Sequence, residues 1–296
     1  MNPHMSVPIA PPLDYVLVPD AFKLPPGLNF GGTSGIALNS KGHIFVLHRG
    51  PQPLMEFDAD GNFIRGWGDG MFERPHGLRI DAQDNIWTTD VAAHVVYKFN
   101  PAGRIVMVLG VKGRAGEVHE FGHLRLFHEP SDAAVGPSGD LYVLQGHGKA
   151  ESRVLKFDRD GNFVKTWGKT GKESGEFNVP HSIVFDAKGL LYIADRSNGR
   201  IQVFDHDGNY VRESKHPGPP CGLFMTDDQF IWLAHGHMGR IMKLDLAGNV
   251  LGEIPGTGPG KGTGQYGEAH YIAVSKRGEI FVADTLNWRV LKYVRR

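Results

Sequence analysis

The sequence contains a single cysteine, Cys221, so no disulfide can form within the 296 residues. A chain with one cysteine is typical of a reducing compartment. Every apolar run is shorter than the ~18 residues that a membrane span requires. The first residues also lack the basic and apolar segments of a secretory signal. Together these absences predict a cytoplasmic protein without a membrane segment.

Net charge is absent as well, because 32 Lys and Arg residues balance 32 Asp and Glu residues. A balanced chain without a basic stripe does not favour binding to nucleic acid or to an acidic lipid surface. No segment repeats its apolar residues with a helical period, so no substantial helix is expected. Glycine and proline are plentiful, at 40 and 19 residues. This composition predicts many short strands joined by tight turns.

A unit of about 40 to 55 residues recurs along the chain. Its six copies begin at Thr33, Pro75, Pro130, Pro180, Pro220 and Ala269. In the clearest copy, apolar runs at 183–185, 190–194 and 200–204 are separated by polar turns that contain glycine, and a further strand begins at 209. Turns of the Asp-Gly type between such runs indicate hairpins. The spacing and the four strands per unit predict propeller blades.

The last copy ends after its third strand, and residues 15–18 offer an apolar segment that can complete it. Pairing these two segments closes the ring and removes an exposed sheet edge. We therefore predict an all-β fold, a six-bladed β-propeller that forms a single domain over 13–296, with an N-terminal tail over 1–12. An open solenoid is the weaker alternative, because it requires polar end caps that the sequence does not show.

One position of the repeat carries most of the chemistry. At the second residue of each copy the sequence reads Ser34, His76, Ser131, His181, Cys221 and His270. Histidines on alternate blades of a six-bladed ring are expected about 120° apart at one depth of the central channel. Three convergent imidazoles with an open coordination position are typical of a catalytic divalent-metal site, usually zinc. The alternative is a repeat consensus in which each histidine caps its own strand.

Residues that follow the second strand add further candidates. Arg49 and Arg196 occupy this place on opposite blades, on the face predicted for the histidines. A guanidinium there can bind a carboxylate and offset developing negative charge, although a surface ion pair is the alternative for each. His147 follows the second strand of the third copy and is a candidate proton-transfer group.

A metalloprotease signature, H-E-x-x-H, occurs at His119, Glu120 and His123. The motif binds zinc only on a helix, where both histidines reach one face. Gly122 interrupts it, and no apolar helical period surrounds it. We therefore do not expect a peptidase site here.

Several segments resemble the NHL-repeat enzymes of the peptidyl-α-hydroxyglycine α-amidating lyase family. They are the runs at 45–50, 75–78, 87–92, 179–182, 194–202 and 269–270, and the similarity extends from about Thr33 to Tyr293. The resemblance implies that His76, His181 and His270 bind a catalytic zinc ion. It also implies that Arg49 and Arg196 act on the substrate.

Two positions depart from the family pattern. The family's catalytic tyrosine follows the second strand of blade three, where this chain has His147, so the base is His147 or is missing. The family also has an aspartate after the third zinc ligand, which holds a structural calcium ion. Tyr271 stands there instead, which argues against calcium. Tyr271 is itself a candidate for the absent catalytic phenol.

From these residues we predict a zinc-dependent lyase that cleaves a C–N or C–O bond of a small carbinolamine- or hemiacetal-like substrate, with another divalent transition metal also possible. Zinc binds the substrate hydroxyl and lowers its pKa, Arg49 and Arg196 hold a carboxylate or carbonyl, and His147 or Tyr271 moves the proton. No nucleic acid, membrane or obligate protein partner is expected. A metal-dependent hydratase or hydrolase on the same site, and a non-catalytic NHL propeller that serves as a binding scaffold, are the alternatives.

Overall fold

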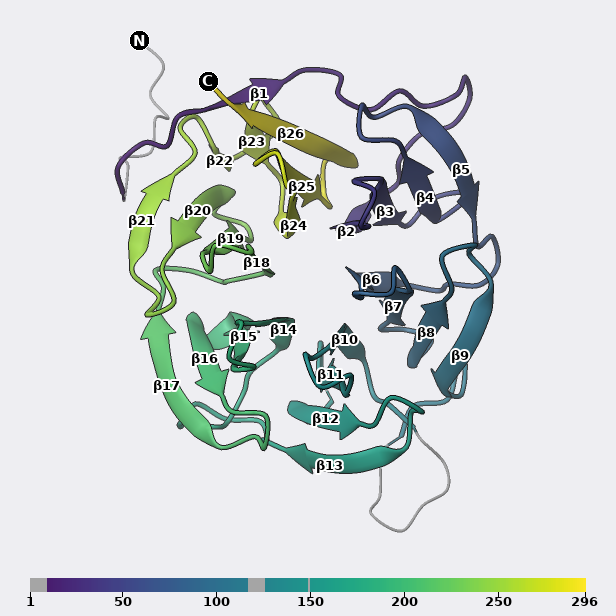
Figure 1. Cartoon of the computed structure of the whole chain (residues 1–296), viewed down its shortest axis with the longest axis vertical. Helices are drawn as coiled ribbons and strands as arrows, with labels where there is room; N and C mark the ends of the chain where they lie inside the picture. Colours follow the sequence, from purple (N-terminus) through teal and green to yellow (C-terminus); the bar gives the residue numbers. More distant parts are fainter. Residues whose placement is uncertain (1–9, 117–125, 149) are drawn as a thin grey trace.

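The computed structural model describes residues 10–116, 126–148 and 150–296. Within them the chain forms six four-stranded antiparallel sheets arranged around a central axis (Figure 1). Five of these sheets follow chain order from the innermost strand to the outermost, and the sixth is completed by the first strand of the chain. The predicted six-bladed β-propeller is confirmed. Residues 1–9 of the predicted tail lie outside the described residues.

The first three blades use twelve strands. Blade one comprises β2 (Thr33–Leu38), β3 (Ile44–His48), β4 (Leu54–Phe57) and β5 (Phe63–Trp67). Blade two comprises β6 (Pro75–Ile80), β7 (Ile86–Asp90), β8 (Val95–Phe99) and β9 (Ile105–Gly110). Blade three comprises β10 (Pro130–Val135), β11 (Leu141–Gln145), β12 (Arg153–Phe157) and β13 (Phe163–Trp167).

The other three blades complete the ring. Blade four comprises β14 (Pro180–Phe185), β15 (Leu191–Asp195), β16 (Arg200–Phe204) and β17 (Tyr210–Lys215). Blade five comprises β18 (Gly222–Met225), β19 (Ile231–His235), β20 (Arg240–Leu244) and β21 (Val250–Glu253). Blade six comprises β24 (Ala269–Val274), β25 (Ile280–Asp284), β26 (Arg289–Arg295) and β1 (Tyr15–Val18), and a short parallel pair, β22 (Gly258–Pro259) and β23 (Gln265–Tyr266), precedes it.

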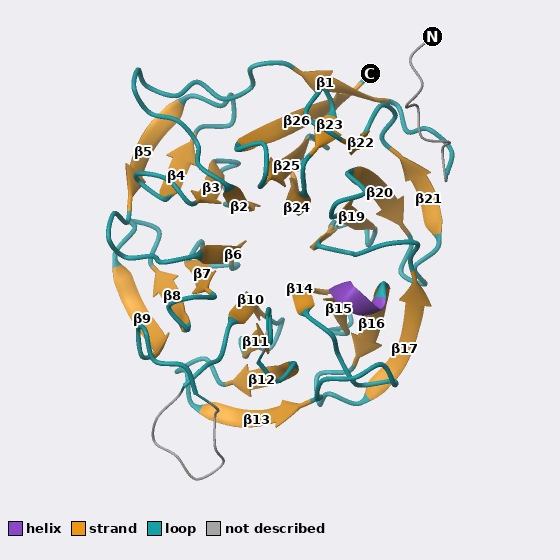
Figure 2. Cartoon of the chain, turned by 180° about the vertical axis from the view of Figure 1, so that it is seen from behind, coloured by secondary structure: helices purple, strands orange, loops and turns teal. Residues whose placement is uncertain are grey.

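Helical structure is confined to a short turn in the described part of the chain. A 3-10 turn, η1 (Arg196–Asn198), joins β15 to β16 and is drawn in purple in Figure 2. No helix within the described residues is long and apolar enough to span a membrane. The absence of a helical period in the sequence is reflected directly in this architecture.

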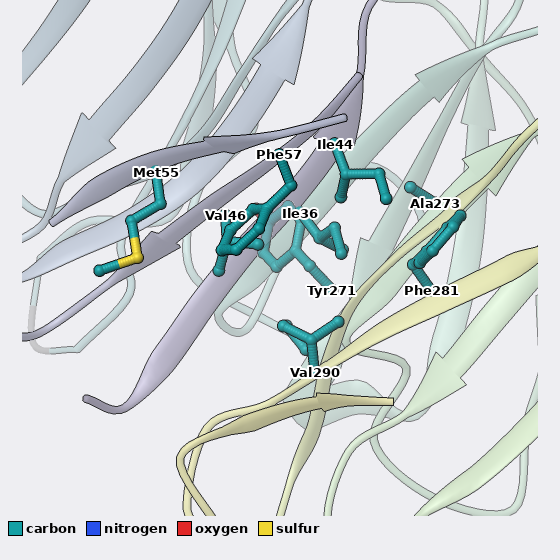
Figure 3. Packing of buried hydrophobic residues seen from close by; sticks show 10 residues of the cluster. Ile36, Ile44, Val46, Met55, Phe57, Tyr271, Ala273, Phe281 and Val290 are labelled. Carbon is teal, nitrogen blue, oxygen red and sulfur yellow. The ribbon is translucent and has the colours of Figure 1, made fainter. Parts of the chain in front are cut away.

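Apolar layers between neighbouring blades form the core. Between blades one and six, Ile36, Val46 and Phe57 pack near Ala273 and Phe281 (Figure 3). Inner strands such as β3, β15 and β25 are buried along their whole length because each of their faces meets another blade. Removing this apolar area from water, at roughly 25 cal/mol per Å², is the main term that holds the ring together.

Recurring aspartate turns link the third and fourth strands of blades. In blade one the Asp58 carboxylate accepts hydrogen bonds from the backbone N–H groups of Asp60 and Asn62, at 2.9 and 2.8 Å. Gly61 completes this turn with a φ of 81°, in the left-handed region that favours glycine. The same carboxylate-to-backbone contact occurs at Asp158 and Asp205, so the turn chemistry fixes the hairpins that the sequence predicted.

The ring closes as the sequence predicted. β1 pairs antiparallel with β26, from Tyr15 opposite Arg295 to Val18 opposite Lys292. Just before β1, Leu13 donates its backbone N–H to the carbonyl oxygen of Glu253 at 2.8 Å, so the chain joins the edge of blade five before it enters blade six. Segments from the two ends of the sequence thus share one sheet, which Figure 2 shows from behind.

Candidate metal centre

Three strand starts bring His76, His181 and His270 together at the axis. Each histidine is the second residue of its strand, on β6, β14 and β24, and each lies at an irregularity in the pairing with the second strand. A bulge of this kind re-aims a side chain that regular pleating would point elsewhere. The ring centroids lie 4.6 Å apart for two of the three pairs and 4.7 Å apart for the third.

Each of these imidazoles is held by the neighbouring blade rather than by its own strand. The Nδ1 atoms contact the carbonyl oxygens at the equivalent position of the next blade: His76 to Ser131 at 2.7 Å, His181 to Cys221 at 3.0 Å and His270 to Ser34 at 2.7 Å. Because a carbonyl only accepts, the proton of a neutral imidazole resides on Nδ1 in all three. Nε2 is then left with a lone pair, as in metal-ligating histidines.

A fourth histidine, His147, joins the cluster from the loop after β11. Its ring centroid lies 4.3 Å from that of His76 and 5.4 Å from that of His181. One ligand atom each of His76, His147 and His181 lies within 4.8 Å of the other two. The Nε2 atoms of these three are buried and have no hydrogen-bond partner in the described part of the chain. Three buried ring nitrogens without hydrogen-bond partners among the described residues form a ligand set that fits a divalent transition metal.

Burial, together with neighbouring charged and titratable groups, favours the neutral form of the four imidazoles. Burial lowers the pKa of His76, His181 and His270 well below 6.5, and the neighbouring histidines of the cluster lower it further. Burial also lowers the pKa of His147 to about 3, and nearby arginines add to the effect. Neutral imidazole is the form that binds a metal, so the site requires no deprotonation near pH 7.

The two predicted arginines lie at the same end of the ring in different environments. Arg49 follows β3, is exposed, and donates from Nε to the Pro75 carbonyl oxygen at 3.4 Å. Arg196 begins η1 and donates from Nη2 to Glu268 Oε1 at 2.6 Å. Both are close enough to His147 for their charges to lower its pKa. The structure therefore brings the arginines to the histidine cluster, with Arg196 already engaged by an acid.

Arg74 and Glu268 are site residues that the sequence reasoning missed. Each stands two residues before a ring histidine, and Arg74 contributes to the lowered pKa of His147. The carboxylate that ends the second strand holds each in place: Asp90 accepts from the Arg74 backbone N–H at 2.9 Å, and Asp284 accepts from that of Glu268 at 3.2 Å. The signal for both residues is their shared place in the repeat, two positions before a ring histidine.

Tyr271 lies beside the histidine cluster, with its ring centroid 5.3 Å from that of His270, but its hydroxyl is turned to the backbone. Its side chain is fully buried in the layer between blades one and six, where Figure 3 labels it. The hydroxyl lies 3.2 Å from the His181 carbonyl oxygen and 3.4 Å from that of Ser131, so its proton is directed to the backbone. With its hydroxyl directed to these carbonyls, Tyr271 packs at the strand starts, and the proton-transfer role of His147 or Tyr271 stays a prediction.

The H-E-x-x-H motif at His119, Glu120 and His123 lies outside the described residues.

Comparison with known proteins supports the NHL repeat and finds amidating lyases among the relatives. The NHL repeat model matches residues 177–204, which cover most of blade four. NHL repeat-containing protein 3 of Homo sapiens is 30% identical over 283 residues, an alignment that covers 89% of this chain and 80% of the human protein. A probable peptidyl-alpha-hydroxyglycine alpha-amidating lyase of Caenorhabditis elegans is 34% identical over 202 residues, covering 59% of this chain and 56% of the nematode protein.

Solved structures share the fold at low identity. A streptogramin B lyase superposes with a TM-score of 0.67 at 15% identity, over 95% of this chain and 98% of the lyase. At that identity the similarity supports the propeller and nothing finer. The chain spans less than two thirds of the length of most of the curated relatives that it matches, for example 65% of the mouse counterpart of the human protein.

Proposed function

The chain belongs to the NHL-repeat β-propeller family, and from this premise we propose that it is a metal-dependent lyase acting on a small hydroxylated substrate. The observation that carries the proposal is the cluster of buried, neutral imidazoles whose Nε2 atoms lack partners among the described residues. Relatives that are named as amidating lyases, at 34% identity, support the reaction class.

Three histidines hold the metal in this proposal. His76, His181 and His270 bind it through Nε2, and the carbonyl oxygens of the neighbouring blades keep their rings oriented through Nδ1. The neutral state of the imidazoles and their nitrogen donors suit zinc. A bound zinc ion supplies a Lewis acid that lowers the pKa of a substrate hydroxyl.

The arginines orient the substrate. Arg49 is exposed and forms no ion pair in the part of the chain that the structure describes, so its guanidinium is available to a substrate carboxylate or carbonyl. Arg196 is fixed by Glu268 through Nη2, and in this proposal a remaining donor of its guanidinium contacts the same ligand. This arrangement selects a small substrate with an anionic or carbonyl group beside the reacting carbon.

His147 moves the proton. Its Nε2 is buried beside His76 and carries no hydrogen bond within the described residues, so it can accept the hydroxyl proton and return it to the leaving nitrogen or oxygen. Because burial lowers the pKa of His147 to about 3, this transfer requires a hydroxyl whose own pKa is strongly lowered by the bound metal. The bond that breaks is the C–N or C–O bond on the hydroxyl-bearing carbon. The carbon becomes a carbonyl, and the leaving group departs with the proton.

Metal analysis of protein purified without an affinity tag tests the proposal. We expect about one divalent metal ion per chain, and its loss in the His76→Ala/His181→Ala double variant with the far-UV circular dichroism unchanged. The metal-loaded protein is then incubated with an N-acyl-α-hydroxyglycine, whose C–N cleavage releases an amide. Absence of any bound divalent metal would falsify the metal centre, and metal binding without amide release would leave the non-catalytic scaffold as the better description.

A further inference from the structure

Arg79 occupies the central axis next to the histidine cluster. It lies on β6, three residues after His76, and its side chain is 14% exposed. Around it stand the residues that directly follow the ring position in three other blades: Asp132, Ser182 and Tyr271. Arg79 does not stand out in the sequence, because one polar residue near the end of a strand is ordinary strand patterning.

One guanidinium contacts four other blades. It forms a two-nitrogen ion pair with Asp132 of blade three, with Nη2 to Oδ2 at 2.6 Å and Nε to Oδ1 at 3.2 Å. Nη2 also donates to Ser182 Oγ of blade four at 2.7 Å, and Nη1 donates to the Leu223 carbonyl oxygen of blade five at 3.1 Å. Its Cζ lies 5.2 Å from the ring centroid of Tyr271 in blade six, a cation–π contact.

These partners are directly connected to the backbone that orients the histidines. Asp132 follows Ser131, whose carbonyl oxygen accepts from His76 Nδ1. Ser182 follows His181 and accepts the Leu223 backbone N–H at 2.9 Å, next to the segment that holds His181 Nδ1. Tyr271 follows His270. A change at Arg79 therefore reaches all three ring positions through one residue each.

The residues of this layer do not fit a calcium ion. Calcium takes six to eight oxygen ligands. The same position in blades one, two and five is glycine, at Gly35, Gly77 and Gly222, and contributes no side-chain oxygen. Asp132 supplies the layer's carboxylate, and it is fully buried and paired with Arg79.

We propose that the Arg79 guanidinium is the resident cation of this layer, where the family resemblance implies a structural calcium ion, and that Arg79 is a positioning residue for the ring histidines. An arginine suits this role because its planar fork presents five donors in fixed directions. A lysine ammonium carries the same charge but lacks the fork that reaches Asp132, Ser182 and Leu223 together.

The first test measures zinc affinity and thermal unfolding of tag-free protein. We expect Arg79→Met to weaken zinc binding by about 10- to 100-fold, as loss of an outer-shell contact does. The zinc affinity of Arg79→Lys should lie between those of Arg79→Met and the wild type. Arg212→Met is the matched control, because Arg212 also lies over a tyrosine ring and donates to a backbone carbonyl, but on the outer strand of blade four. An unchanged zinc affinity in a folded Arg79→Met variant would overturn the positioning role.

The second test addresses the resident cation and is independent of zinc. Metal-free wild-type protein is heated with and without 1 mM calcium chloride, and we expect the same Tm in both. A rise of several degrees on calcium addition would show that a divalent ion still enters the layer and would refute the proposal. If the protein binds no zinc, the proposed metal centre is wrong. The calcium experiment still tests whether Arg79 is the resident cation of the layer.

A double variant covers the case in which Arg79→Met does not fold. Arg79→Met leaves the Asp132 carboxylate buried without its cation, which is severely destabilising. Arg79→Met/Asp132→Asn removes that charge and keeps an acceptor for the backbone N–H of Ile183, which Asp132 Oδ2 binds at 3.0 Å. We expect the double variant to fold with weakened zinc affinity, and wild-type affinity in it would count against the proposal.

Discussion

Replacing His270 or His147 by alanine, one at a time, decides which imidazoles hold the metal. We expect His270→Ala to lose metal binding, because His270 is fixed through Nδ1 in the same way as His76 and His181. His147→Ala should keep the metal and lose turnover, since His147 comes from a loop and is proposed to transfer the proton rather than to bind the metal. The two variants distinguish two possible ligand sets. The ligand atoms that lie closest together include His147, whereas the three histidines anchored through Nδ1 include His270.

The size of the effect follows from linkage. Zinc at 1,000 times its Kd stabilises the folded protein by about 4.1 kcal/mol. With an unfolding entropy of about 2.1 cal/mol/K per residue, the 296-residue chain has about 0.6 kcal/mol/K, so Tm rises by about 6–7 °C. A variant whose affinity is about 1,000-fold weaker gains only about 0.4 kcal/mol at the same zinc concentration, less than 1 °C.

Thermal unfolding with and without added zinc measures this difference. His216→Gln is the control, because His216 is a buried histidine that follows the outer strand β17 and lies outside the cluster. It should show the full wild-type shift. If His147→Ala loses the zinc shift and His270→Ala keeps it, the metal belongs to His76, His147 and His181, and the proton-transfer role of His147 is wrong.

Three further predictions follow. Arg49→Met should raise KM for a carboxylate-bearing substrate by about 10- to 150-fold with little change in Tm, because a charge-assisted hydrogen bond is worth about 1.5–3 kcal/mol; an unchanged KM in steady-state kinetics contradicts the orienting role. Burial raises the pKa of the Cys221 thiol to about 12, so the native protein should resist iodoacetamide at pH 8 and react after unfolding, which mass spectrometry detects. The metal-free protein should lose stability as the pH falls below 6.5, by up to about 1.4 kcal/mol per pH unit for each buried histidine, because the unfolded chain takes up protons that His76, His181 and His270 do not. Equilibrium urea unfolding between pH 7.5 and 5 measures this slope, and a flat profile contradicts the neutral imidazoles.

The propeller and the ring histidines were predictable because both repeat. Blade boundaries recur with the turn residues, and His76, His181 and His270 share one position of the repeat. The closure by β1 followed from counting strands in the last unit. Each of these predictions compares six copies of one repeat, so a pattern seen in one copy can be checked in the other five.

The remaining parts of the site depend on contacts that do not repeat. The pairing of Arg196 with Glu268 joins residues 72 positions apart, from loops on two blades. The direction of the Tyr271 hydroxyl depends on which carbonyl lies within reach, although its place near the axis could be predicted. Arg79 was overlooked for the same reason, since its five-blade network has no counterpart in another copy of the repeat.

The closure of the ring would also govern when the proposed metal centre can form. His270 Nδ1 bonds to the Ser34 carbonyl oxygen across 236 positions of sequence, and blade six is complete only when β1 has paired with β26. Contacts of such long sequence separation form slowly, because they carry a large loop-closure entropy. During synthesis, blades two to four present His76, His147 and His181 before His270 is available. If His270 is the third ligand, we expect the nascent chain to bind metal poorly until its last blade docks, which would make ring closure a checkpoint for loading the ion.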